Sequence, residues 1–166
     1  MKKIGIVSLI IIIFDRIFKE LVTNNLTLNV RNKVIDGFFY ITNCHNDGAA
    51  FSLFSGNVLF LILITLMVLY LIYKTIEKNN INKIGTISYG LLLGGILGNL
   101  FDRIFYGYVI DYLDFRIFNF NFAIFNLADM AIVIGAILLI VFEGSGNDGR
   151  NNKNRCRKLR KEWKNR

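Results

Sequence analysis

Proline is absent from the 166 residues, histidine occurs once and cysteine occurs twice. Without proline, no helix in the chain is required to carry a proline kink. The single histidine, His45, has Cys44 as its sequence neighbour rather than as a nucleophile facing it. We therefore interpret His45 as a surface loop residue and not as the base of a catalytic triad. Neither Cys44 nor Cys156 has the spacing of a metal ligand.

Charged residues are also few. Asp, Glu, Lys and Arg make up 19% of the chain, hydrophobic residues make up 54%, and the mean hydropathy is +0.45. Soluble domains are less apolar and carry about 25% charged residues. Because the apolar residues also occur in long runs, the composition indicates a multi-pass membrane protein.

Four apolar segments are predicted to span the membrane: residues 4–22, 58–73, 84–100 and 126–142. The first segment follows a basic start as a signal peptide does, but no small-x-small cleavage motif comes after it, so it is predicted to be an uncleaved span. At its far end, Asp15 and Lys19 share one helical face and are able to pair. The third segment has glycines four residues apart, which let helix backbones approach closely in lipid. We therefore expect the third helix to be central in the bundle.

Two segments predict a small sheet outside the bilayer core. Within residues 24–56, Leu26–Arg31 alternates apolar and polar residues, and Asp36-Gly37 between apolar runs indicates a hairpin. In Phe105–Phe125, aromatic residues alternate with Asn, Asp and Arg, which is typical of an interfacial ribbon or amphipathic segment. We expect both segments to lie on the same side and to form one cap over the bundle.

Basic residues give the orientation. They gather at the N-terminus (Lys2, Lys3), in the connection of Lys74, Lys78 and Lys83, and in the tail at 150–166. Four spans place all three groups on one side, which the positive-inside rule identifies as cytoplasmic. Both termini are thus predicted to be cytoplasmic, with Cys44 and Cys156 on opposite sides and unable to form an intramolecular disulfide.

The predicted fold class is an all-α membrane protein with four transmembrane helices and a small extracytoplasmic β-sheet. We expect one domain over residues 1–143 and a disordered basic tail over 144–166. The formal net charge of +8 comes largely from that tail and the other basic groups. We interpret the tail as a solvated anchor to anionic lipid and predict no nucleic-acid partner.

Polar residues converge at the outer ends of the predicted spans: Asp15, Lys19, Asn46, Asn99, Asp102, Arg103, Asp111, Asn126 and Asp129. An ionisable group at the edge of a span is costly, so a functional role is its default interpretation. Two carboxylates held close together cannot both ionise easily, and one keeps its proton. The ionised acid can then activate water while the other protonates a carbonyl oxygen. Asp111 and Asp129 are the candidates for this pair, and Asp129, in the first turn of a helix, is expected to be the more acidic.

Simpler structural interpretations stand beside these functional ones. Asp15 and Lys19 would be an ion pair at the water interface, Asn126 a helix cap, and Arg103 an interface anchor. Gly48 would supply a positive φ in a tight turn. The glycines of the third span are interpreted as packing residues, because no GK[ST] motif follows them.

Five motifs occur in order along the chain: DRIFK (15–19), NDGAAF (46–51), GNLFDR (98–103), GYVIDY (107–112) and FNLAD (125–129). Together they resemble the lipoprotein signal peptidases, also called signal peptidase II. The resemblance covers most of the chain from Asp15 to Asp129.

The resemblance implies an aspartic endopeptidase of the bacterial inner membrane, without metal or cofactor. Such enzymes remove signal peptides from prolipoproteins by cutting before a diacylglyceryl-modified cysteine. By motif, Asp111 and Asp129 would be the catalytic dyad. The substrate-binding or supporting residues would be Asn46, Gly48, Asn99, Arg103, Asn126, Asp15 and Lys19. Membrane lipid is an expected partner, globomycin an expected inhibitor, and a monomer the expected state.

Two other functions remain open from the residues alone. A small membrane transporter would use the aspartates as a proton or cation relay, although its site would usually lie near mid-bilayer and not at one face. A non-catalytic assembly factor would bind partners through its cap and would tolerate loss of the carboxyl pair.

Overall fold

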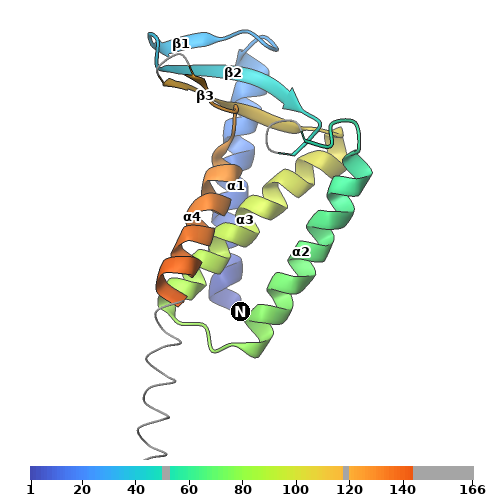
Figure 1. Ribbon diagram of the computed structural model, residues 1–166, viewed down its shortest axis with the longest axis vertical. Helices are drawn as coiled ribbons and strands as arrows, with labels where there is room; N and C mark the ends of the chain where they lie inside the picture. The colour runs from blue at the N-terminus through green and yellow to red at the C-terminus, as the bar shows by residue number, and fades with distance from the viewer. Residues whose placement is uncertain (50–52, 118–119, 144–166) are drawn as a thin grey trace, which may run out of the picture.

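The structure is a computed structural model that describes residues 1–49, 53–117 and 120–143. Figure 1 shows helices standing side by side beneath a sheet that covers one end of the bundle. The N-terminus and the connection between the second and third helices lie at the opposite end (Figure 1). The predicted combination of a helical bundle with a small sheet is confirmed.

The described helices are α1 (Lys2–Asn25), α2 (Val58–Lys78), α3 (Lys83–Tyr106) and α4 (Leu127–Leu138), and α4 continues into the short π-helix η2 (Leu139–Glu143). Helices α1, α2 and α3 each contain one predicted span, and α4 with η2 covers the fourth from Leu127 onward. The second helix runs beyond its predicted end, so Lys74 and Glu77 are helical and form an ion pair at 2.9 Å. The predicted tail at 144–166, with Cys156, lies outside the described residues.

Two of these helices, α2 and α3, are long and apolar enough to cross a membrane. The apolar stretch of α4 and η2, Leu127–Phe142, is shorter, and α1 carries four charged residues between Asp15 and Glu20. That α1 and α4 also cross the bilayer stays a prediction. Large apolar side chains are exposed along the helices, including Leu59 and Met67 of α2, as on a lipid-facing surface.

Helix α3 is central, because it packs against α1 and α4 and, less extensively, against α2. Its glycines make this possible. A Cβ at Gly90 would lie 2.5 Å from Cβ of Val7, and a Cβ at Gly95 would overlap the carbonyl oxygen of Ala128. The predicted role of the glycines in close helix packing is confirmed.

The sheet has the strand order β1-β2-β3-β4, with strands β1 (Asn32–Ile35), β2 (Phe39–Asn46), β3 (Val109–Ile117) and β4 (Phe120–Asn121). Adjacent strands are antiparallel. The predicted turn at Asp36-Gly37 is confirmed, with Gly37 at φ 71°. Because β2 pairs with β3, the two segments predicted to form the cap belong to one sheet.

The alternating stretch Leu26–Arg31 was expected to be a strand, and this prediction is wrong. The stretch contributes only an isolated bridge between Leu28 and Asn43. Asn29 has φ 59°, in the left-handed region, which interrupts an extended conformation and which asparagine tolerates better than most residues. The sheet therefore begins only at Asn32.

Candidate functional site

Asp111 and Asp129 lie on different elements, which backbone hydrogen bonds hold together. Asp111 lies on β3, and Asp129 lies in the first turn of α4. The amides of Tyr112 and Leu113 on β3 donate hydrogen bonds to the carbonyl oxygen of Phe125, just before α4, at 3.1 and 2.8 Å. Both carboxylates consequently line one cavity of about 290 Å³ below the sheet.

Two asparagines hold the carboxylate of Asp111. Asn46 Nδ2 donates to Oδ2 at 2.9 Å, and Asn126 Nδ2 donates to Oδ1 at 2.7 Å. Burial, and next the charge of Asp129, raise the pKa of Asp111 to about 7, although the two amide hydrogen bonds lower it. Asp111 therefore exchanges its proton near neutral pH.

Asp129 is held by a different set of donors. Its Oδ1 accepts from Asn99 Nδ2 at 2.7 Å, and its Oδ2 accepts from the Asn126 amide at 3.2 Å. The Asp129 amide donates to Asn126 Oδ1 at 2.9 Å, which completes a capping box. The predicted cap at Asn126 is thus confirmed, and the same side chain also contacts Asp111. The helix N-terminus favours a negative charge at Asp129.

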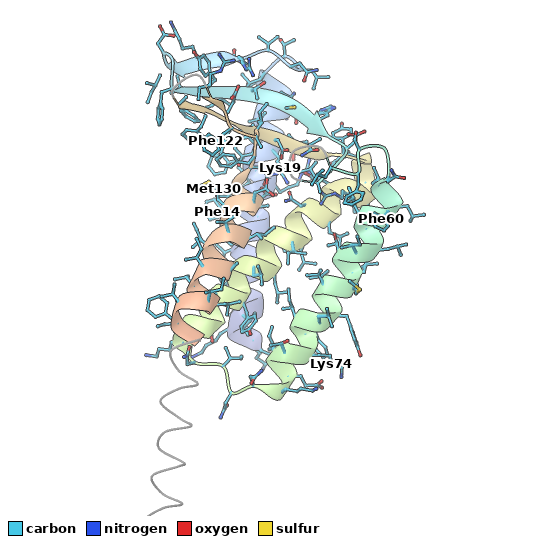
Figure 2. The ribbon with its side chains drawn as sticks, in the orientation of Figure 1. Phe14, Lys19, Phe60, Lys74, Phe122 and Met130 are labelled. Atoms are coloured by element: carbon cyan, nitrogen blue, oxygen red, sulfur yellow. The ribbon has the colours of Figure 1, made fainter. Side chains whose placement is uncertain are left out.

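Lys19 lies where the helices meet the sheet (Figure 2). None of its surface is exposed. Its Nζ lies 2.8 Å from Asp15 Oδ2, 2.8 Å from Asp102 Oδ2 and 3.0 Å from Asn99 Oδ1. The predicted pairing of Asp15 with Lys19 is confirmed, whereas their interpretation as a pair at the water interface is wrong because both are buried. An ammonium group only donates, so Lys19 fixes the oxygen of Asn99 and leaves its NH₂ group for Asp129.

The two carboxylates around Lys19 also bind backbone amides next to the cavity. Asp15 Oδ1 accepts from the amide of Ala128 at 3.0 Å, and Asp102 Oδ2 accepts from the amide of Ile110 at 3.3 Å. Each of these amides belongs to the residue directly before one of the two cavity aspartates. The buried charges of α1 and α3 therefore position both Asp111 and Asp129.

The loop after β2 is attached to α3 by Arg103. Its Nη2 donates to the carbonyl oxygen of Gly48 at 3.0 Å, and the Gly48 amide donates to Asn46 Oδ1 at 3.0 Å. The predicted positive φ at Gly48 is wrong, because among the described glycines only Gly37, Gly56 and Gly107 have one. Arg103 also lines the cavity, so interface anchoring does not account for its contacts.

Asp102 was predicted among the polar residues that converge at the outer ends of the spans, but no role was assigned to it. It lies three positions after Asn99, on the same helical face. Arg16 and Tyr112 of this network were not among the predicted residues. Arg16 donates to Asp102 Oδ1 at 3.0 Å. The Tyr112 hydroxyl accepts from the Leu127 amide at 3.1 Å and so supports the start of α4. Burial raises the pKa of Tyr112, which keeps its hydroxyl neutral.

His45 and Cys44 lie outside this network. His45 is exposed, as predicted, but it lies on β2 and not in a loop, and its ring stacks on Tyr108 with centroids 3.8 Å apart. Cys44 is a free thiol, and burial raises its pKa. In residues 1–49, 53–117 and 120–143, no group of three or more His, Cys, Asp or Glu side chains is arranged to hold a metal ion.

Known proteins are similar to this chain in sequence and in fold. Residues 7–143 match the family model described as signal peptidase (SPase) II. A lipoprotein signal peptidase of Halothermothrix orenii is 42% identical over 82% of this chain and 92% of its own. One of Bacillus pumilus is 36% identical over 82% of this chain and 88% of its own.

Two solved structures described as bacterial membrane enzymes, determined by the in meso method, have the same fold. The one at 2.3 Å resolution is 31% identical, covers 90% of this chain and 92% of its own, and has a TM-score of 0.81. The one at 1.9 Å resolution is 33% identical, covers 85% of this chain and 92% of its own, and has a TM-score of 0.75. The chain therefore belongs to the signal peptidase II family and is a peptidase, as its five motifs predicted.

Proposed function

We propose that this chain removes signal peptides from prolipoproteins, cutting before a diacylglyceryl-modified cysteine with Asp111 and Asp129 as its catalytic dyad. The observation that carries the proposal is that the two carboxylates line one small cavity while different donors hold them. A shared cavity lets two acids act on the same water and peptide bond, and unlike surroundings let them take opposite roles.

In the proposed reaction, Asp129 is ionised and takes a proton from the attacking water. Its position at the N-terminus of α4 and its hydrogen bonds from Asn99 and Asn126 favour the charged form. Asp111 is protonated and donates to the peptide oxygen as the carbonyl carbon becomes tetrahedral. Asp129 then passes the water proton to the amide nitrogen as the C–N bond breaks, and Asp111 takes its proton back as the carboxyl product forms. A pKa of about 7 suits this task, because the acid keeps its proton at neutral pH yet releases it readily.

Arg103 and Asn46 are proposed to bind the substrate backbone at the cavity. Arg103 Nε is buried without a hydrogen-bond partner among the described residues, so it is a free donor for a peptide carbonyl. Asn46 positions Asp111, and its loop is held through Gly48. Ile132 and Val133 of α4 belong to the apolar part of the lining, together with Val109, Ile124 and Phe125, and an apolar lining suits an acylated substrate.

The proposed topology has four spans, both termini in the cytoplasm, and the sheet at the outer face of the inner membrane. This places the dyad at the membrane surface, where a diacylglyceryl cysteine and the end of a signal helix meet. The proposed domain is residues 1–143, acting as a monomer in contact with membrane lipid. Globomycin is proposed to compete with substrate for the dyad cavity.

The test is cleavage of two matched precursors by the purified protein. One carries a diacylglyceryl-modified cysteine and the other is its unmodified twin. We expect the protein to cleave only the first, and we expect Asp111→Asn and Asp129→Asn each to abolish cleavage while the protein still inserts in the membrane. Normal cleavage by either variant would remove that aspartate from the dyad.

Asp114→Asn is the matched control, because Asp114 is a buried carboxylate on the same strand that does not line the cavity. It should keep its activity. Addition of EDTA should leave cleavage unchanged. Loss of activity with EDTA and recovery with a divalent ion would contradict the proposed mechanism.

A further inference from the structure

A second cavity lies at the end of the bundle opposite the sheet. It has a volume of about 500 Å³ and is bounded by α1, α2 and α3, with Ile4, Gly5 and Ile12 on α1, Ile76 on α2 and Leu97 on α3. Its lining is almost wholly apolar. It shares no residue with the cavity of Asp111 and Asp129, so it is a separate feature.

A larger cavity of about 1020 Å³ lies beside the apolar one, and Met1, Ile4 and Ile76 line both. The side chains around this larger cavity are both polar and apolar and include Lys2, Lys3 and Lys83. Within the described part of the chain, none of these three lysines forms an ion pair with a carboxylate. Three cations without a carboxylate partner therefore lie around the cavity next to the apolar one.

The charge around this larger cavity also depends on Glu77 and on the ends of the helices there. Glu77 lies there, but its carboxylate is paired with Lys74 at 2.9 Å. Helices α1 and α3 both begin at this end, and neither has an acidic residue in its first turn. The positive ends of two helix dipoles thus lie close to the lysines, and the C-terminal end of α2, which also lines this cavity, offsets only one of them.

The length of the apolar cavity matches one leaflet of a bilayer. On α1 it extends from Met1 to Ile12, which corresponds to roughly 16 Å of helix. The hydrocarbon core of a bilayer is about 30 Å thick, so the cavity spans about half of it. This length fits one acyl chain, whereas a transmembrane helix would need the full thickness.

We propose that this groove binds an anionic phospholipid of the leaflet at the N-terminal end of the bundle. One acyl chain lies along α1 between α2 and α3, and the phosphate contacts Lys2, Lys3 and Lys83. The signal helix of a substrate does not fit this site, because its basic n-region would meet three lysines. The lipid also supports α2, whose buried residues are only Leu61 and Ile76.

The experiment is native mass spectrometry of the full chain, released from detergent after delipidation. Phosphatidylglycerol and phosphatidylcholine with identical acyl chains are added separately, and inorganic phosphate is added as a competitor. Because each lysine near an anionic headgroup is worth about 1 kcal/mol, or roughly fivefold, three lysines predict a preference for phosphatidylglycerol of tenfold to about a hundredfold. Millimolar phosphate should not displace the lipid.

Two kinds of variant separate the headgroup contacts from the acyl-chain contacts. The triple variant K2Q/K3Q/K83Q should lose the preference for phosphatidylglycerol, whereas Lys78→Gln, at the same end but outside the cavity, should keep it. Gly5→Leu should lose binding of both lipids, because a side chain at Gly5 meets no atom within 4 Å and extends into the groove. Gly5→Ala should bind as the wild type does.

Equal retention of the two lipids by the wild-type chain would overturn the proposal. So would wild-type binding by Gly5→Leu, a variant that keeps all the lysines and therefore the charges that determine membrane orientation. Displacement of the lipid by phosphate alone would show a simple anion site, and this would also contradict an acyl chain in the groove.

Discussion

At the scale of single residues, the site depends on how amide groups are divided between two acids. Asn126 contacts both, since its Nδ2 donates to Asp111 while its backbone amide and Oδ1 bind Asp129. Asn46 contacts only Asp111, and Asn99 contacts only Asp129. Each acid therefore has one side-chain amide donor that does not contact the other acid. Substitution of that asparagine should change the pKa of one acid without removing a hydrogen bond from the other.

The first prediction concerns the pH dependence of cleavage. In the proposed reaction, Asp111, whose pKa burial raises to about 7, must be protonated to act as the acid, so kcat/KM should fall above that pH by about tenfold per pH unit. The hydrogen bond from Asn46 lowers the pKa of Asp111, so Asn46→Ala should raise it. The falling limb of the profile should then move to higher pH. A limb that stays in place, or moves to lower pH, would contradict Asp111 as the acid.

The second prediction concerns Lys19, the ammonium group between Asp15 and Asp102. Lys19→Met leaves the buried carboxylate of Asp15 without its cation, whereas Asp102 keeps its ion pair with Arg16. Removal of one partner of a buried ion pair costs about 3–5 kcal/mol. We expect a marked fall of the melting temperature in detergent. Adding Asp15→Asn to this variant should restore part of the stability, because it removes the unpaired charge and keeps an oxygen for the Ala128 amide.

Lys33→Met is the control for this experiment. Lys33 pairs with Asp36 at 3.4 Å, but both side chains are largely exposed, at 59% and 80%. Exposed pairs are screened by water, so this variant should melt at nearly the wild-type temperature. If Lys19→Met were as stable as Lys33→Met, the buried charges would not hold the helices together.

At the scale of elements, contacts between α3 and the start of α4 determine where Asp129 lies. Gly95 faces the carbonyl of Ala128, one residue before Asp129, and Gly98 faces Oδ2 of Asp15. The Ala128 amide is in turn held by Asp15. Small residues on α3 thus allow α1, α3 and α4 to meet directly behind the cavity.

The third prediction follows from this packing. In Gly95→Ala, the new Cβ would overlap the Ala128 carbonyl oxygen, so α4 must shift, at a cost of about 1–3 kcal/mol. Cleavage of the lipidated precursor should fall as well, because Asp129 moves with the first turn. Gly5→Ala is the matched control, since its Cβ meets no atom within 4 Å. Equal melting temperatures and activities for the two variants would contradict the prediction.

The helices and the hairpin were predictable because their signals are local. Apolar runs mark the helices, and Asp36-Gly37 marks the turn. The interruption at Asn29 has no such signal, because its left-handed conformation breaks an alternation that by itself is typical of a strand. The meeting of Asp111 with Asp129 was inferable from topology, but the roles of Arg16 and Tyr112 depend on contacts between distant segments, which periodicity does not encode.

At the scale of the whole molecule, charged side chains gather at the two ends of the bundle, and apolar side chains cover the helices between them. Lys19 of α1 lies near the sheet, and Lys74 of α2 lies at the end of the bundle away from the sheet (Figure 2). Buried charges gather beneath the sheet, whereas Lys2, Lys3 and Lys83 line the larger cavity at the opposite end of the bundle. A bilayer between these two ends would meet chiefly the exposed apolar side chains of the helices, which is the arrangement a membrane protein needs.

The last prediction tests the direction in which the bundle crosses the membrane. Basic residues at the end opposite the sheet favour a cytoplasmic position for that end, so the hairpin should face outward. Asp36, at the hairpin, is 80% exposed, and Asp36→Cys in a Cys44→Ser, Cys156→Ser background should react with an impermeant maleimide in spheroplasts. Cys156, kept as the single cysteine in a Cys44→Ser protein, should react only after the membrane is permeabilised. Reaction at Cys156 in sealed spheroplasts would reverse the orientation and place the dyad on the side where no lipidated substrate is presented.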